Sequence, residues 1–213
     1  MIVVAAMLGG TLAACDSGNP PSPFPQTSNP TPPSLAPQVM VLRPNMLAGY
    51  VRTDDSTVDA GTIADQENDQ SLVDTLKKEG LQVGARATYA DPNRGAPPTP
   101  FATVISQVLF FNDVQGAGSF YNDELQRREK KPDQGTLSQL TLAQGSADAI
   151  AGLVVTVPAD TSGDPPSRAL FALIRSGRYV AELLGGGPDT TATDDRFAAL
   201  VTLQEQQLMQ KAG

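Results

Sequence analysis

Residues 81 to 111 carry two different apolar patterns, and together they predict two neighbouring strands. From Leu81 to Tyr89 apolar and polar side chains alternate, as they do in a strand with one solvent-facing side. A loop rich in Pro and Gly follows (91–100), and then Phe101 to Phe111 is apolar on both faces. That second run predicts a central strand that is covered on both sides.

Three helices are predicted around these strands. The first ends at Gly80, which suits a C-terminal cap. The second follows Asn112 or Asp113, and the last follows Thr191 or Thr193; each of these residues can cap a helix start. The apolar positions fall at helical spacing in all three helices. In chain order they are Leu72, Val73 and Leu76; Val114, Ala117, Tyr121 and Leu125; and Phe197, Val201 and Leu208.

The second half of the chain predicts four more strands. Two lie around 137–142 and 153–157. A hairpin follows, with strands at 169–175 and 178–184 joined by Ser176-Gly177, because a two-residue glycine turn between apolar runs is a strong hairpin signal. The segment Gly185-Gly186-Gly187-Pro188 is expected to end the last strand.

These elements predict an α+β fold of order α-β-β-α-β-β-β-β-α. We expect an antiparallel sheet of about six strands with helices packed on it. Residues 39–50 are expected to pack on the edge of the domain, and a polar, acidic stretch separates them from the first helix. The segment 38–213 has the length of a single domain.

The first 15 residues are typical of an export signal. An apolar run, 2–8, precedes Leu12-Ala13-Ala14-Cys15, and it is too short to span a membrane. Leu12-Ala13-Ala14-Cys15 resembles the lipobox of bacterial lipoproteins. The resemblance implies cleavage before Cys15, a covalent lipid on its thiol and attachment to a membrane. A lone cysteine can also be a small buried apolar residue, and Cys15 is the only one in the chain.

Residues 15–37 predict a tether between the anchor and the domain. Eight prolines stand there among Ser, Thr, Asn and Gln, a composition that favours extended polyproline II and forms no packed core. A recognition motif for proline-binding modules is the alternative interpretation. The chain thus divides into a signal peptide (1–14), a lipid-anchored Pro-rich linker (15–37) and one domain (38–213).

The residue types exclude several kinds of chemistry. The chain has no His, so Ser-His-Asp and Cys-His catalysis and His-ligated zinc are excluded. A net charge of −8 argues against nucleic acid as a partner. We find no nucleophile motif and no phosphate-binding loop. We therefore expect no catalytic residue, no cofactor and no metal.

Three weaker patterns leave alternatives open. Asp65, Glu67 and Asp69 alternate as calcium ligands can, but without the turn glycine and bidentate Glu of such sites. The glycines at 185–187 could cradle a phosphate or form a plain loop, and Gly116-x-Gly118 is most simply explained by close packing. Four arginines could line an anion-binding sheet face or simply point outward from it. They are Arg86, Arg168, Arg175 and Arg178.

The order of elements over 38–213 resembles two groups of exported bacterial domains. A helix with Ala117 and Tyr121 inward, followed by a late hairpin with Arg175, Gly177 and Val180, looks like the extracellular sensor domain of PknH-type kinases and like lipoproteins with a PsbP-like fold. Those kinase domains typically carry disulfides, and this domain has no cysteine. The resemblance implies ligand or partner binding without catalysis.

We therefore expect a lipoprotein on the outer face of the cell membrane with a non-catalytic domain that binds an envelope ligand or protein. Asp16 after the anchor cysteine resembles the signal for retention at the inner membrane in bacteria that have two. The alternative is an envelope enzyme, such as a glycan hydrolase, that uses carboxylates alone.

The anchor is tested by changing Cys15 to Ala. Without the thiol no lipid can be attached, so the domain should leave the membrane fraction or persist as an uncleaved precursor. Detergent phase partitioning and intact mass measure this, with Ser17→Ala as the matched control. Unchanged membrane partitioning of the Cys15 variant would defeat the lipoprotein interpretation.

Overall fold

The computed structural model describes residues 37–93, 95, 99–130, 135–159 and 165–212. The predicted signal, Cys15 and the linker up to residue 36 lie outside the described residues. Pro37, the last residue of the expected linker, is buried and begins the first element. The elements are η1 Pro37–Val39, η2 Pro44–Met46, β1 Val51–Val58, α1 Ala60–Gln66, α2 Leu72–Lys78, β2 Leu81–Ala90, β3 Thr103–Phe111, α3 Val114–Arg128, β4 Thr136–Gln139, β5 Ala149–Val157, β6 Ser167–Ser176, β7 Tyr179–Pro188 and α4 Asp194–Ala212.

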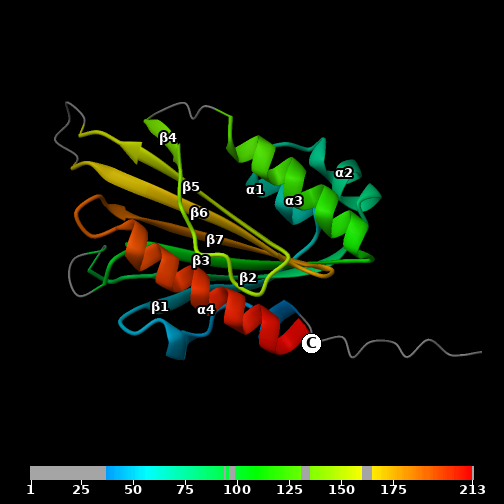
Figure 1. Ribbon diagram of the computed structural model, residues 1–213, viewed down its shortest axis with the longest axis horizontal. Helices are drawn as coiled ribbons and strands as arrows, with labels where there is room; N and C mark the ends of the chain where they lie inside the picture. The colour runs from blue at the N-terminus through cyan, green and yellow to red at the C-terminus, as the bar shows by residue number, and fades with distance from the viewer. Residues whose placement is uncertain (1–36, 94, 96–98, 131–134, 160–164, 213) are drawn as a thin grey trace, which may run out of the picture. The chain divides into compact units, whose positions relative to one another are not determined.

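The strands form one antiparallel sheet in the order β1-β2-β3-β7-β6-β5-β4 (Figure 1). Two meanders, β1–β3 and β4–β7, each pair consecutive strands, which hydrogen-bond locally along the chain. The pairing of β3 with β7 joins the meanders, with Ile105 opposite Leu184. The predicted α+β class and the central position of β3 are confirmed.

The sheet has seven strands rather than the six expected, because β1 was not predicted from the sequence; helix α1 was not predicted either. β1 is an edge strand whose side chains are mostly exposed, so it lacks the apolar alternation that marks a half-buried strand. An ion pair, Arg52 Nη2 to Asp55 Oδ1 at 2.6 Å, lies along it. α1 is short and begins at Ala60, directly after Asp59, whose carboxylate caps the helix by accepting from the backbone N–H of Thr62.

The β6–β7 hairpin is confirmed, with two corrections. Ser176 pairs with Tyr179, so the turn is Gly177-Arg178 rather than Ser176-Gly177, and Gly177 adopts a φ of +55° that other residues rarely reach. Gly185-Gly186-Gly187-Pro188 does not end the strand. It continues β7 because β3 and β6 hydrogen-bond it from both sides.

Helix starts and ends follow the predicted signals. Asp113 caps α3 by accepting from the N–H of Gly116, and Gly80, with φ +81°, follows α2. A Cβ on Gly116 would lie 1.8 Å from the carbonyl oxygen of Glu79. This glycine therefore lets α3 pack closely against the end of α2, as expected for Gly116-x-Gly118.

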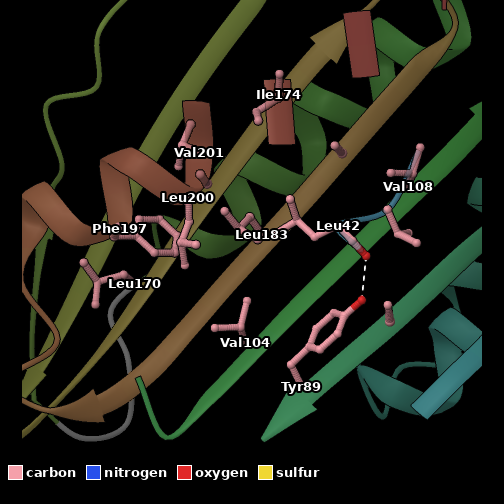
Figure 2. Close-up of a cluster of buried hydrophobic side chains, with 14 of the residues drawn as sticks. Leu42, Tyr89, Val104, Val108, Leu170, Ile174, Leu183, Phe197, Leu200 and Val201 are labelled. Carbon is pink, nitrogen blue, oxygen red and sulfur yellow. Dashed lines mark hydrogen bonds between the residues drawn. The ribbon is translucent and has the colours of Figure 1, made fainter. Parts of the chain in front are cut away.

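Helix α4 and the leading segment, residues 37–50, cover one face of the sheet. Phe197, Leu200 and Val201 of α4 point toward Leu170 and Leu183 of the sheet (Figure 2). The predicted buried stripe of the last helix is confirmed. Residues 39–50 reach the core itself, not only its edge, because Met40, Val41 and Leu42 are fully buried.

A chain of buried hydrogen bonds fixes this leading segment. Gln204 of α4 donates to the carbonyl of Met40 at 2.9 Å and accepts from the Ser106 hydroxyl at 2.6 Å. Ser106 in turn accepts from the N–H of Leu42 at 2.9 Å. The Tyr89 hydroxyl donates to the Leu42 carbonyl at 2.6 Å (Figure 2). We call Met40, Leu42, Ser106 and Gln204 the polar lock.

Helices α1, α2 and α3 pack on the opposite face and gather at one end of the sheet (Figure 1). Their buried contacts are with residues near the β6–β7 turn, including Leu109, Phe111 and Val180. Beyond the C-terminal end of α3, β4, β5 and β6 continue past the helices. The helices thus cover only part of this face.

Changing Gln204 to Leu tests the polar lock. The substitution leaves the Met40 carbonyl and the Ser106 hydroxyl buried without their partner, which should lower the free energy of unfolding by about 2–4 kcal/mol. Urea unfolding measures the loss. Gln206→Leu is the matched control, because Gln206 is exposed on the same helix and should cost little. Equal stability of the two variants would show that the lock contributes nothing.

Candidate functional site

The face that α3 leaves uncovered holds an open apolar hollow of about 290 Å³, here called the trough. Its floor consists of two cross-strand rows of side chains, which lie on the same face because directly paired residues point the same way. The first row is Ile105, Leu184, Phe171 and Leu153. The second is Thr103, Gly186, Ala169, Val155 and Leu137.

Two features keep the trough open. α3 ends at Arg128, whose side chain forms one wall. Gly186 contributes no side chain, and a Cβ built on it would meet nothing within 4 Å. Ala169 beside it is exposed to solvent. The sheet surface there is therefore apolar, accessible and unfilled, unlike the packed core on either side.

A row of three polar side chains lies next to the trough, here called the polar row. Arg86, Gln107 and Glu182 stand directly opposite one another on β2, β3 and β7. They line a smaller hollow of about 190 Å³. This hollow shares Ile105 and Leu184 with the trough, so the two meet at these residues.

An ion-pair cluster from α3 and α1 covers the polar row. Glu124 is nearly fully buried and pairs with Arg127 and, at 2.5 Å, with Arg128 Nε. Arg128 Nη2 also reaches Glu67 Oε1 at 2.6 Å. The Arg128 guanidinium lies 5.0 Å from the centre of the Phe171 ring, a distance that suits a cation–π contact. Arg128 thus separates the trough from the polar hollow.

Glu182 differs from the other carboxylates of this region. Its exposed fraction is 5%, and no residue that the structure describes bonds or pairs with its carboxylate. Burial raises the pKa of Glu182 above its ordinary value; the charge of Arg128 opposes this, and Glu67 adds to it. An unpartnered buried carboxyl is costly and is a feature of functional sites.

Another pair of carboxylates, Glu79 and Asp123, lies between α2 and α3, away from the trough. Burial raises the pKa of Glu79 to about 7, and the like charge of Asp123 acts in the same direction. Arg127 and Lys78 oppose the shift. Both carboxylates line a polar hollow with Gln115 and Ser119.

The acidic pattern at 65–69 does not form a metal site in the structure. Glu67 pairs with Arg128, Asp65 accepts from the Gln70 amide at 2.6 Å, and Asp69 accepts from the Ser71 hydroxyl at 2.6 Å. Within the described residues no group of three or more acidic or other ligating side chains could hold a metal ion. The 185–187 glycines lie inside a paired strand and form no phosphate loop.

The four arginines do not share one sheet face, so the alternative that they line a common anion-binding face is wrong. Arg86 and Arg175 belong to the face beneath α3, where Arg175 lies 6.0 Å from the Tyr121 ring centre. Arg168 belongs to the opposite face and pairs with Asp194 at 2.5 Å. Arg178 lies in the hairpin turn, 4.8 Å from the Phe110 ring centre.

Gln107 and Glu182 were not among the predicted site residues. Gln107 follows Ser106 in β3, Glu182 is the only charged residue of β7, and both strands are otherwise largely apolar. A polar side chain in such a strand has no exposed face to occupy, and that conflict is a detectable signal. The pairing of β3 with β7, which brings the two residues together, is not visible in the sequence. Cys15 and the residues before it lie outside the described residues.

Comparison with known proteins supports the fold. No family model matches the chain, and no curated protein matches it. Among solved structures, the extracellular domain of PknH from Mycobacterium tuberculosis is similar, with a TM-score of 0.50 and 11% sequence identity over 78% of this chain and 93% of that one. The resemblance noted in the sequence to PknH-type domains is thereby confirmed for the fold. No helix in the described part of the chain is long and apolar enough to cross a membrane.

The raised pKa of Glu79 predicts a pH-dependent stability. The folded state binds this proton more tightly than the unfolded state, so stability should fall as pH rises from about 5 through about 7. Because the group is half-buried and screened, we expect a loss of about 1 kcal/mol. Glu79→Gln should remove much of the decline between pH 5 and pH 8, seen in thermal unfolding.

The matched control is Glu129→Gln, an exposed position at the end of α3, which should leave the pH profile of the wild type unchanged. If the Glu79 and Glu129 variants gave the same profile as the wild type, the carboxyl of Glu79 would not be the group responsible.

Proposed function

We propose that this chain is a lipid-anchored protein on the extracytoplasmic side of the cell membrane, whose domain binds a small apolar ligand in the trough without catalysing a reaction. The main observation in favour of ligand binding is the trough itself. It is an open apolar surface on the part of the sheet that α1, α2 and α3 leave uncovered. Its volume of about 290 Å³ lies just below the usual range of ligand sites, about 300–1,000 Å³, and suits a small ligand.

The N-terminal residues support the proposed location of the protein. Leu12-Ala13-Ala14-Cys15 and the Pro-rich segment behind it support a lipid anchor and a spacer. The similar solved structure is described as an extracellular domain, which agrees with this placement.

A carboxylate-dependent hydrolase is the second candidate, because Glu67, Glu124 and Glu182 all line the polar hollow. Hydrolysis of a glycoside by two carboxyl groups needs one acid and one free carboxylate that face the scissile bond. Glu67 and Glu124 are held in ion pairs with Arg128. Only Glu182 is unpaired among the three, so the arrangement favours binding over hydrolysis.

Filling the trough tests the proposed binding. A leucine at Gly186 would project into open space and occupy the floor, so Gly186→Leu should abolish saturable binding of the uncharged apolar fluorophore N-phenylnaphthylamine. Titration of the full chain, followed by fluorescence, measures this. The control is Ala199→Leu, which adds the same side chain at an exposed position of α4.

The variant at Gly186 should keep the thermal unfolding temperature of the wild type or raise it. Undiminished binding by a folded Gly186 variant, or an absence of saturable binding in the wild type, would overturn the proposed site.

A further inference from the structure

The polar row contains more hydrogen-bonding capacity than the protein uses. Glu182 and Gln107 each have an exposed fraction of 5%. Within the part of the chain that the structure describes, the side chains of Glu182, Gln107 and Arg86 form no hydrogen bond or ion pair. Buried polar groups are normally satisfied, and leaving them unsatisfied costs stability. Two such side chains, with the half-buried Arg86 beside them, lie in one cross-strand row and form a built site rather than a scattered set.

The three groups open on the hollow that adjoins the trough. The apolar rows end at Ile105 and Leu184, and the polar row begins at the next inward-facing positions, Gln107 on β3 and Glu182 on β7. A molecule that lay along the trough would therefore bring its end to the polar row. The surface changes from apolar to polar over two residues of each strand.

The charges around the polar hollow select the kind of end group. Glu67, Glu124 and Glu182 line it together with Arg86 and Arg128. An anionic group would lie against three carboxylates, and a cationic group against two guanidinium groups. Arg86 and the Gln107 amide offer donors, while Glu182 and the Gln107 carbonyl offer acceptors. Hydroxyl groups both donate and accept, so they match this mixture without adding a charge.

We infer that the trough and the polar row form one site for an amphipathic molecule with an alkyl chain and an uncharged, hydroxyl-bearing head. The chain lies on Ile105, Leu184 and Phe171, and the head hydrogen-bonds Arg86, Gln107 and Glu182. This inference rests on the proposed function and specifies its ligand. A glyceride and a glycolipid share this chemistry, and the experiment below separates them.

Four probes with the same alkyl length test the head group. They are decanoylglycerol, decyl maltoside, decanoate and decyltrimethylammonium, each titrated into the full chain below its micelle-forming concentration by displacement of N-phenylnaphthylamine. The two hydroxylated probes should bind at least about tenfold more tightly than the two charged ones, as expected when buried donors and acceptors gain partners. Tighter binding of decanoylglycerol than of decyl maltoside would indicate a glyceride-sized head, and the reverse order a sugar head.

Two variants connect the preference to the polar row. Glu182→Leu removes the acceptor and should reduce the preference for hydroxylated heads to within about threefold, with an unchanged or raised unfolding temperature because an unsatisfied buried group is removed. Glu182→Gln keeps a hydrogen-bonding side chain and should keep the preference. Glu129→Leu, an exposed position, is the control and should bind as the wild type does.

The outcomes separate this inference from the proposed function. Equal binding of all four probes, or a preference for a charged head, would overturn the inference and leave the apolar site standing. A preference that persists in Glu182→Leu would overturn the role of the polar row. Failure of every probe to bind the wild type would overturn both.

Discussion

The site depends on a mismatch between the width of the sheet and the helices available to cover it. Seven antiparallel strands present two faces, and each must be buried against other elements. On one face α4 and the leading segment complete the cover. On the other, α1, α2 and α3 gather at one end, and α3 stops at Arg128. Beyond that point the first row is covered in part by Arg128, and the second row stays half-buried, with Ala169 exposed. The trough is therefore a consequence of helix length and placement.

The same geometry explains why the polar row is tolerated. Glu182 and Gln107 lie under the last turn of α3, where the ion pairs of Glu124 and Arg128 place charges above them. Burial raises the pKa of Glu182 and the charges of the nearby arginines lower it, and the effect of burial prevails. A fully apolar row would pack better and give a more stable domain. Retention of three polar groups in this position fits the general finding that binding sites depart from optimal packing.

Local patterns in the sequence determined most of the elements. Asp113 and Gly80 marked helix ends, and the apolar run of β3 marked a strand buried on both faces. β1 was missed because its pairing with β2, rather than its own side chains, stabilises it. The glycines at 185–187 were expected to form a loop, since only the neighbouring strands reveal that they are paired. The site was missed for a related reason: Gln107 and Glu182 are 75 positions apart, and their contact depends on the β3–β7 pairing.

The polar lock also affects the order of folding. Met40 and Gln204 are 164 residues apart, and the contact between them closes only when α4 is available. Each meander can pair its own strands early, because those contacts are local, whereas closure of the whole domain needs both ends. A chain leaving the ribosome would thus stay incompletely folded until α4 has emerged. Such a delay would be compatible with the export proposed above, because a chain that crosses a membrane must do so before it folds.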